Sequence, residues 1–395
     1  MIRFFFNVTI MKIRLIILFV FLTLGSLVKA QNYAAKFKDV SGKWGFINPL
    51  GEVIVKPKYT TCRPFKSGMA KVGLIYFINE HGQKMQTKEY LKEAKEFGDG
   101  LLAVKIQTKW GFINRDGELV IPAIYKNVTS FNDGLSVVES KEDFAVLNKE
   151  GKRIEIKTVK GRISEKGKLT EIKPFKNGLA EVVVDLYPGP NDELRSGFIN
   201  VKGELVIKPE YVQVGDFYEG LCRVRTTSGR ISFIDKLGNV VIKTDYIRTG
   251  NFSGGFAWVR TEDGKIGFID KKGEMLIQPQ FSTVKDFDPL TGIAMVKKGK
   301  KWDYVNSKGE SIGIERMETY KKFSEGFALV QKDKLWGYID ATGKWLVSPK
   351  YKAATAFKNG FARVKIKGKW GVINKEGKLI VDPIYKNIKE FHSIY

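Results

Sequence analysis

The chain has 395 residues, enough for two or three ordinary domains or for one repeat array that has no single globular core. Hydrophobic residues make up 43% of the sequence, which excludes a disordered protein, and 40 glycines against 12 prolines indicate many tight turns. A formal net charge of +24 attracts anionic partners such as nucleic acid or acidic polysaccharide. Lysine outnumbers arginine about fourfold, which favours a solvated basic surface over specific phosphate or base recognition.

Residues 1–30 have the pattern of a secretory signal peptide. Residues 11–14 carry two positive charges, residues 15–24 form an apolar core, and small residues precede a cleavage position after Ala30. Met11 is an alternative start, because the ten residues before it look like an upstream extension of the reading frame. The apolar core is too short for a stable membrane span, and no later segment approaches the roughly 18 residues that a span needs. We therefore predict an exported protein, periplasmic, cell-surface or secreted, with a mature charge of 24 − 4 = +20 and no membrane span after cleavage.

One repeat then accounts for residues 31–395. After a predicted first strand over residues 33–40, the motif Trp-Gly-Phe-Ile-Asn at 44–48 returns with small changes at 110–114, 336–340 and 370–374. Weaker copies end, like these, on Asn or Asp. The ten end positions are Asn48, Asn79, Asn114, Asn148, Asn200, Asp235, Asp270, Asn306, Asp340 and Asn374. They follow each other at intervals of 31 to 36 residues, with one interval of 52, so the period is about 35 residues.

The strands within a copy are separated by recognisable turns. A glycine stands three residues after each Asn or Asp, and Asn-x-x-Gly between apolar segments is a hairpin signal. The run that follows is apolar on consecutive residues, as in 53–55 and 119–121, which predicts a strand covered on both faces. The proline just past this run, for example Pro57, is expected to end the pairing.

A connection of constant length comes next. An aromatic residue and a phenylalanine stand six residues apart in seven copies, as in Tyr125 and Phe131, so we expect a packed loop whose aromatic side chains fill the core. A further strand then begins with Gly-apolar-small-x-Val, as in 360–364. Each copy is therefore predicted to be a three-stranded antiparallel meander.

These features resemble the WG (KWG) repeats of bacterial proteins. The KWGFIN-like core, the Asn/Asp-x-x-Gly turn, the Pro-x-Tyr step and the Phe-x-x-Gly-apolar-Ala strand carry the resemblance over residues 33–395. The resemblance implies a β-rich array with an interaction role, and it supplies no catalytic residues. Because copies such as the one with Ile75 and Tyr76 lack Trp-Gly, we interpret the tryptophan as a packing preference and not as an obligatory ligand site.

For the fold class we expect an all-β protein whose roughly ten units stack in an open twisted superhelix, each unit contacting mainly its neighbours. Residues 383–395 are not followed by another Gly-apolar-small-x-Val strand, so we interpret them as a terminal cap. A closed propeller-like ring is the alternative. Ten three-stranded blades would exceed the usual number of about four to eight blades with four strands each. Two smaller closed arrays are a third arrangement.

Candidate binding residues come from departures from the repeat. The irregular unit around 152–195 holds a predicted Lys-rich hairpin at 152–168 and a turn-rich protrusion at 185–195, and loops on a regular scaffold often carry function, although neutral drift in loop length explains them as well. In the protrusion the candidates are Tyr187, Pro188, Asn191 and Asp192. Trp258 and Trp345 lie off the Trp-Gly motif and are candidate exposed rings for a sugar, whereas Trp44, Trp110, Trp336 and Trp370 are interpreted as core.

The sequence offers little material for catalysis. His81 and His392 are the only histidines, which leaves almost no basis for general acid–base chemistry or zinc ligation by histidine. The recurring Asn or Asp is best interpreted as a turn cap, because a calcium site would need several carboxylates together. No phosphate-binding loop is present, so we assign no catalytic, cofactor-binding or metal-ligating residue. Cys62 and Cys222 are expected to be free and buried.

We therefore expect a non-catalytic exported binding or scaffold protein whose partner is a protein or an anionic cell-envelope polymer. Two alternatives come from other classes of protein. One is a binder of nucleic acid or another polyanion through the basic surface, and the other is a hydrolase that uses carboxylates brought together by the fold.

Overall fold

The computed structural model describes residues 32–141, 143–156, 167–188 and 193–395. The predicted signal peptide at 1–30 lies outside these residues. In the described part, no helix is long and apolar enough to cross a membrane.

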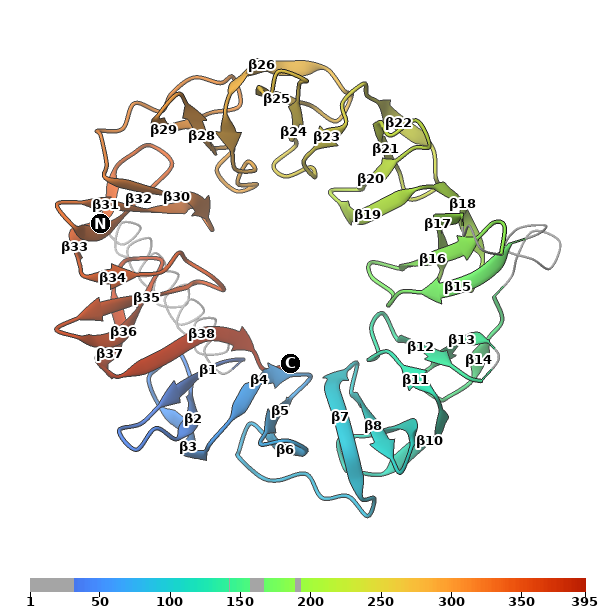
Figure 1. The fold of residues 1–395 in the computed structure, drawn as a ribbon. Helices are drawn as coiled ribbons and strands as arrows, with labels where there is room; N and C mark the ends of the chain where they lie inside the picture. Colours follow the sequence, from blue (N-terminus) through green and yellow to red (C-terminus); the bar gives the residue numbers. More distant parts are fainter. Residues whose placement is uncertain (1–31, 142, 157–166, 189–192) are drawn as a thin grey trace, which may run out of the picture.

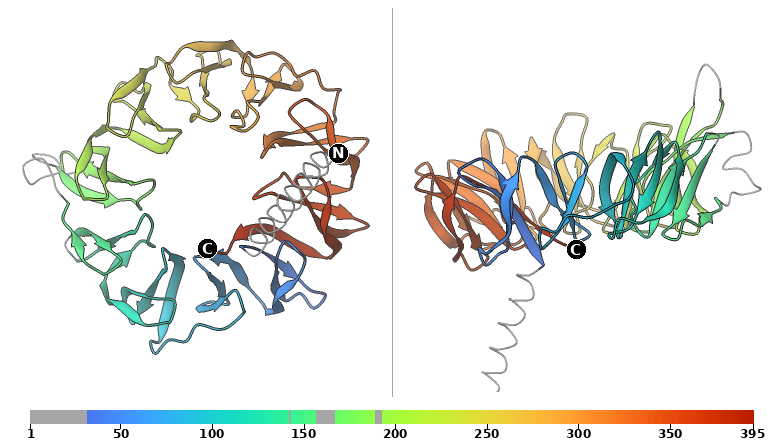
Figure 2. Two further views of the ribbon diagram at one scale, coloured as in Figure 1. Left: turned by 180° about the vertical axis from the view of Figure 1, so that it is seen from behind. Right: turned by 90° about the horizontal axis from the view of Figure 1, so that it is seen from below.

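The described strands form ten antiparallel sheets arranged as the blades of a closed ring (Figure 1). Seen from the side, the ring is a single layer of blades (Figure 2).

From the centre outward, blades 1 to 5 consist of β38 (Asn387–Ser393), β1 (Tyr33–Lys38), β2 (Trp44–Ile47) and β3 (Val53–Tyr59); β4 (Cys62–Lys66), β5 (Met69–Val72) and β6 (Tyr76–Asn79); β7 (Leu91–Gly98), β8 (Leu101–Ile106), β9 (Lys109–Ile113) and β10 (Leu119–Tyr125); β11 (Asn127–Val128), β12 (Leu135–Glu139), β13 (Phe144–Asn148) and β14 (Arg153–Ile154); and β15 (Lys168–Ile172), β16 (Leu179–Asp185), β17 (Leu194–Asn200) and β18 (Leu205–Tyr211). Blades 6 to 10 consist of β19 (Gln213–Tyr218), β20 (Leu221–Arg225), β21 (Ile231–Ile234) and β22 (Val240–Lys243); β23 (Arg248–Thr249), β24 (Ala257–Arg260), β25 (Ile266–Ile269) and β26 (Met275–Phe281); β27 (Thr283–Val284), β28 (Ala294–Lys298) and β29 (Lys301–Val305); β30 (Thr319–Ser324), β31 (Phe327–Lys332), β32 (Leu335–Ile339) and β33 (Trp345–Tyr351); and β34 (Ala353–Ala354), β35 (Phe361–Ile366), β36 (Lys369–Asn374) and β37 (Leu379–Tyr385).

The all-β prediction is confirmed, but the expected open superhelix is wrong. Residues 383–395 are not a leftover cap, because β38 pairs antiparallel with β1 and completes blade 1, placing Phe391 opposite Ala35. The backbone N–H of Ile394 also donates to the carbonyl of Asn32 (N···O 2.8 Å). A blade built from both ends of the repeat array leaves no open end, and ring closure follows from that pairing.

The three-stranded unit is also wrong for most copies. Eight of the ten described sheets have four strands, because the segment predicted as a packed loop forms the innermost strand. In blade 6, for example, β19 begins two residues after Tyr211 and includes Phe217. The repeat therefore begins with this inner strand, and the Trp-Gly strand is the third of its blade.

The glycine of the Trp-Gly motif decides whether a full outer strand forms. A Cβ on Gly45 would lie 2.5 Å from the carbonyl oxygen of Val55, because the bulged outer strand runs directly against it. The six blades with glycine here all have outer strands of seven residues. Ser232 and Ala145 go with outer strands of four and two residues, and the blades with Tyr76 or Asp303 at this position have three strands.

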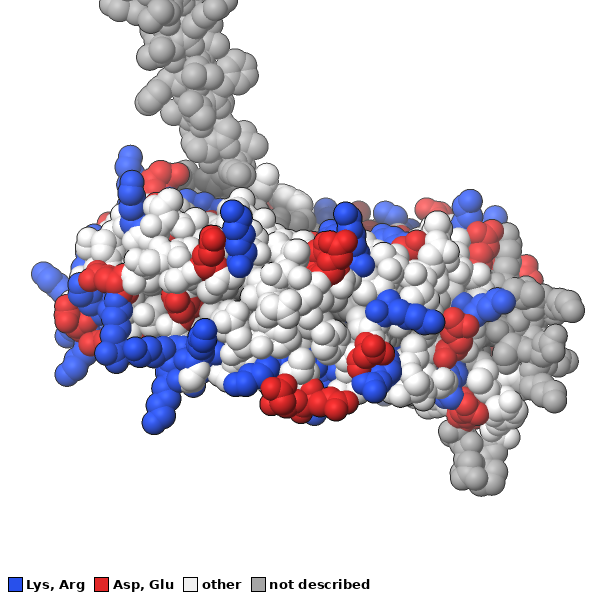
Figure 3. All heavy atoms as spheres, turned by 90° about the horizontal axis from the view of Figure 1, so that it is seen from above, with Lys and Arg blue, Asp and Glu red and all other residues white. Residues whose placement is uncertain are grey.

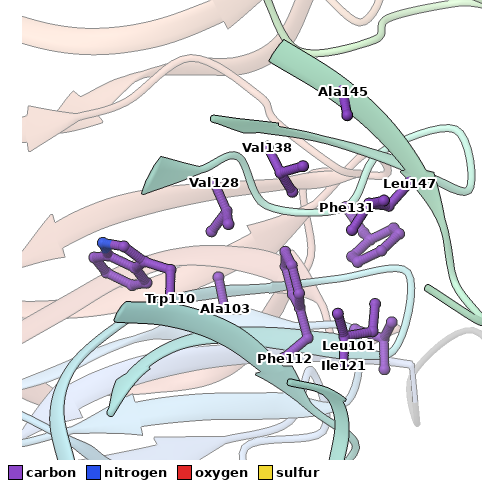
Figure 4. Packing of buried hydrophobic residues seen from close by; sticks show 10 residues of the cluster. All are labelled: Leu101, Ala103, Trp110, Phe112, Ile121, Val128, Phe131, Val138, Ala145 and Leu147. Carbon is purple, nitrogen blue, oxygen red and sulfur yellow. The ribbon is translucent and has the colours of Figure 1, made fainter. Parts of the chain in front are cut away.

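The hydrophobic core lies between blades, as one cluster at each of the ten junctions. At the junction of blades 3 and 4, Phe112 of the Trp-Gly strand packs edge to face against Phe131, three residues after the inner strand of blade 4, with ring centroids 4.8 Å apart (Figure 4). Such pairs contribute about 0.5–1.5 kcal/mol beyond the burial of their area. Equivalent aromatic pairs join most of the other blades.

Two expectations for the outer strand fail. Only the third residue of each apolar run is buried, as with Val55 in β3, whereas Val53 is largely exposed, because no further layer covers the rim of the ring. Proline lies inside this strand and does not end it: Pro57 and Pro383 stand within β3 and β37. An edge strand tolerates proline because its outward N–H has no partner to lose, and the proline also discourages pairing with another chain.

The turn after the Trp-Gly strand agrees with its interpretation as a cap. The Asn48 side-chain oxygen accepts from the N–H groups of Leu50 and Glu52 (both 3.0 Å), and Gly51 takes a φ of +81°. Asp235 and Asp270 make the same bonds in their blades. The motif tryptophans are less uniform than expected, since Trp110 is buried and Trp44, Trp336 and Trp370 are half-buried.

Candidate functional site

The junction of blades 6 and 7 contains a cavity that interrupts the packed inner wall of the ring. Its volume is about 250 Å³. The inner strand of blade 7, β23, has only two residues, whereas β19 of blade 6 has six. We call this cavity the arginine pocket; its lining residues are Gln213, Val214, Gly215, Arg223, Val224, Arg225, Ile231, Ile247, Arg248, Thr249 and Trp258.

Two glycines distinguish the blades that form the pocket. Each inner strand or its extension carries a phenylalanine, and the residue two positions before it has a side chain in eight blades: Arg63, Lys95, Thr129, Lys173, Lys285, Lys321, Thr355 and Lys389. In blades 6 and 7 this position is Gly215 and Gly250. Neither has a positive φ, so backbone strain does not require glycine at either site. Two neighbouring blades thus both lack the side chain that stands at this place elsewhere.

Gly250 makes room for Trp258. A Cβ on Gly250 would lie 2.3 Å from the indole Nε1, so the ring occupies space that any side chain at 250 would take. Trp258 is half-buried, packing on one side against the core between blades 7 and 8 while also lining the pocket. The candidate exposed ring is therefore a fixed aromatic wall of a cavity.

Three arginines line the pocket without a carboxylate among them. Arg223 donates to the carbonyl of Thr249 across the junction. Arg225 donates to the carbonyls of Gly229 (2.7 Å) and Ile247 (3.4 Å). None of the three forms an ion pair with an acidic side chain in the described part of the chain. Arg248 is exposed at the edge of the pocket, so its guanidinium group is available to an anion.

Thr249 adds a buried hydroxyl. The residue is 1% exposed, and its Oγ1 has no hydrogen-bond partner among the described residues. A buried hydroxyl left in this state costs about 1–3 kcal/mol. In the core between blades 5 and 6, the Cys222 thiol donates to the carbonyl of Gly215 (3.1 Å), and burial raises the pKa of this thiol to about 12. Cys222 is therefore a structural group behind the pocket wall.

The arrangement suits binding. Arginines and a tryptophan line a small cavity, and such a combination of an apolar surface with few polar groups is typical of ligand sites. The pocket lining contains no histidine, carboxylate or thiol that could act as an acid, base or nucleophile. Within the described residues, no group of three or more His, Cys, Asp or Glu side chains is arranged to hold a metal ion.

A larger cavity of about 570 Å³ lies at the junction of blades 10 and 1 and is less suited to a charged ligand. Its lining contains both signs of charge. Glu325 already accepts from the backbone N–H of Gly360 (2.8 Å) and pairs with Lys375 (3.2 Å). Two of its charged groups, Glu325 and Lys375, are thus engaged within the fold.

The other candidate residues from the sequence do not join the pocket. Tyr187 is 62% exposed, and its backbone N–H donates to the Asp185 carboxylate (3.1 Å). Pro188 is exposed beside it, whereas Asn191 and Asp192 lie outside the described residues, as does most of the predicted hairpin at 152–168. Trp345 is half-buried against the core between blades 8 and 9.

Sequence reasoning found Trp258 and missed the arginines and Thr249. The sequence did contain a signal for the arginines, because they cluster in one part of this lysine-rich chain. Five of its 14 arginines lie within residues 223–260: Arg223, Arg225, Arg230, Arg248 and Arg260. The paired glycines at 215 and 250 were a second signal. Both become visible only when the copies are aligned on the inner strand, which the sequence interpretation treated as a loop.

Comparisons with known proteins give one informative match. No curated protein matches the chain. Among solved structures, the computationally designed Ika8 protein is 14% identical with a TM-score of 0.32, covering 75% of this chain and 98% of its own. BamB from Moraxella catarrhalis is 10% identical with a TM-score of 0.30, covering 71% and 91%. At these TM-scores the likeness carries no argument.

The family comparison is decisive. The model of the WG containing repeat matches residues 44–73, 110–152, 197–227, 231–265, 266–302, 318–336, 336–370 and 370–393. These segments cover well over half of the chain and fall on the blades described above. The chain therefore belongs to the WG-repeat family.

Proposed function

We propose that this ring is a non-catalytic binding module that acts outside the cytoplasm and holds an anionic polymer of the cell envelope. The observation that carries the proposal is the arginine pocket, in which three arginines without acidic partners surround an open cavity. Arginine presents a planar fork of donors that fits carboxylates and phosphates, and charge-assisted hydrogen bonds of this kind are roughly twice as strong as neutral ones.

The basic character of the whole chain is weaker support. On the side of the ring shown in Figure 3, lysines and arginines alternate with acidic residues, as in an ordinary solvated surface. Ion pairs such as Lys176 with Asp216 (2.6 Å) neutralise part of the charge locally. The net charge raises the concentration of polyanions near the protein, whereas a defined site requires the unpaired arginines.

The test compares binding of an acidic polysaccharide, polygalacturonate, by two variants that lose the same charge. Arg225→Gln with Arg248→Gln removes two pocket cations, and Lys272→Gln with Lys308→Gln removes two exposed turn lysines. We expect at least a tenfold loss of affinity for the first variant and less than a twofold loss for the second, measured by calorimetry at 150 mM salt. An equal loss in both variants would mean nonspecific attraction, because that kind of binding depends on charge and salt alone.

Export is tested separately. The charged and apolar pattern of residues 11–24 supports cleavage after Ala30. Mass spectrometry of the protein purified from culture medium or envelope fractions should give a chain beginning at Gln31. A chain that retains residues 11–30 in the cytoplasmic fraction would contradict the proposed location.

A further inference from the structure

The arginine pocket is too small for an extended ligand. At about 250 Å³ it lies below the roughly 300–1,000 Å³ of cavities that enclose drug-sized molecules. One unit of a polymer is therefore the largest group that it is suited to enclose. The rest of such a polymer would continue along the inner face of the ring.

The walls call for a ligand with an apolar face as well as a charge. Trp258 forms one wall, and Ile231 adds aliphatic surface. Inorganic phosphate or sulfate would use the arginines and leave these surfaces uncovered. A sugar ring presents C–H groups on one face and hydroxyls at its edge, which matches an indole beside polar groups.

The three arginines have two roles. One of them connects neighbouring blades, and the other two can bind an anion. Arg223 is engaged with the Thr249 carbonyl, a contact that recurs elsewhere in the ring, since Lys36 and Arg363 donate to the equivalent carbonyls of Cys62 (2.8 Å) and Ile388 (3.0 Å). It therefore holds blades 6 and 7 together. Arg248 and the remaining donors of Arg225 are left for an anion at the edge of the pocket.

We propose that the arginine pocket binds one hexuronate residue of an acidic polysaccharide. The carboxylate lies against Arg225 and Arg248, and the sugar ring stacks on Trp258. This inference rests on the proposed function and names the chemical class of its ligand. No bond is made or broken in this process.

A substitution that fills the pocket without changing its charge gives the sharpest test. Gly215 has room for a Cβ, which would lie 3.4 Å from the nearest atom, the carbonyl oxygen of Arg223. Threonine occupies the equivalent position in blades 4 and 10, where Thr129 and Thr355 accept from the backbone N–H groups of Val137 (2.9 Å) and Arg363 (3.0 Å). Gly215→Thr should therefore fold normally. The control at the same position is Lys285→Thr in blade 8, which introduces threonine away from the pocket and also removes one positive charge.

The ligands are trigalacturonate, its methyl ester, inorganic phosphate and a thymidine oligonucleotide. We expect trigalacturonate alone to bind the unmodified protein, with at least a tenfold loss in Gly215→Thr and less than a twofold change in Lys285→Thr, measured by calorimetry. Unchanged binding by Gly215→Thr, equal binding of the methyl ester, or displacement by phosphate would overturn the hexuronate site and leave the proposed function standing. Preferential binding of the oligonucleotide, or no binding of any polyanion, would overturn both.

Discussion

Much of the positive charge near the inner wall holds the ring together. Lys71 donates to the carbonyl of Ala94 in the next blade (2.7 Å), and Lys95 donates to that of Val128. Burial lowers the pKa of both lysines, which reflects how far they are withdrawn from solvent. Acidic residues act in the same way on the turns, where Glu325 accepts from backbone N–H groups of the following blade. A basic residue at the inner wall can therefore hold neighbouring blades together and need not be available to a ligand.

The two cysteines allow the packing at single residues to be tested. Burial raises the pKa of Cys62 to about 11 and that of Cys222 to about 12, whereas an unfolded thiol titrates near 8.5. Only the thiolate reacts with disulfide reagents, so both thiols should be protected in the folded protein at pH 8 to 9 and react once it unfolds. Titration with a chromogenic disulfide should give no thiols without denaturant and two with it. Rapid native reaction of either thiol would contradict this packing.

Because the outer strand lies on the motif glycine, its position is sensitive to substitution. In Gly111→Val, the new Cβ would be 2.6 Å from the carbonyl oxygen of Ile121, so β10 must shift. Tyr76→Val changes the same position in blade 2, which has no fourth strand to displace. We expect Gly111→Val to lower the free energy of unfolding by roughly 1–3 kcal/mol, as overpacking does, and Tyr76→Val to change it by less than about 1 kcal/mol. Urea unfolding of both variants measures these changes in the free energy of unfolding. Equal losses in the two variants would mean that the glycine does not set the position of the outer strand.

The sequence predicts elements well where a signal repeats in every copy. The period, the Asn-x-x-Gly turns and the all-β class depend on local chemistry that ten copies display together. The inner strand escaped prediction because in blades 4, 7, 8 and 10 it has only two residues, as in β11, and its aromatic spacing also fits a packed loop. The arginine pocket escaped because it depends on departures in two single copies, Gly215 and Gly250, which average out when a repeat is sought.

At the scale of the whole molecule, the sequence favoured an open superhelix over a closed ring, and this prediction was wrong. Both arrangements use the same contacts between neighbouring blades, and they differ at one junction. There Ala35 and Phe37 of β1 meet Val372 and Phe391 from the other end of the array in a single core cluster. Pairing between strands more than 350 residues apart has no local signature in the sequence. The structure is therefore needed to show that the ring closes. The arginine pocket lies at another junction of the ring, between blades 6 and 7.

Closure can be tested by breaking and restoring the connection between β1 and β38. Removing residues 387–395 uncovers one edge of β1 and deletes Ile388 and Phe391, both buried, each worth roughly 1.5–3 kcal/mol of burial. We therefore expect the truncated chain to melt at a clearly lower temperature. A permuted chain that joins 395 to 32 through a short flexible linker and opens at the exposed turn between Glu262 and Asp263 keeps every strand.

The permuted chain should therefore melt within a few degrees of the original. The N–H of Ile394 already donates to the carbonyl of Asn32 (2.8 Å), so the linker spans almost no distance, and the new ends lie within one hairpin whose two strands remain paired. Differential scanning calorimetry of the three chains distinguishes the arrangements. In an open array, the truncation would remove only a terminal strand and lower the melting temperature slightly. Joining the distant ends of such an array would distort the fold. A stable truncated chain together with an unstable permuted one would thus refute the ring.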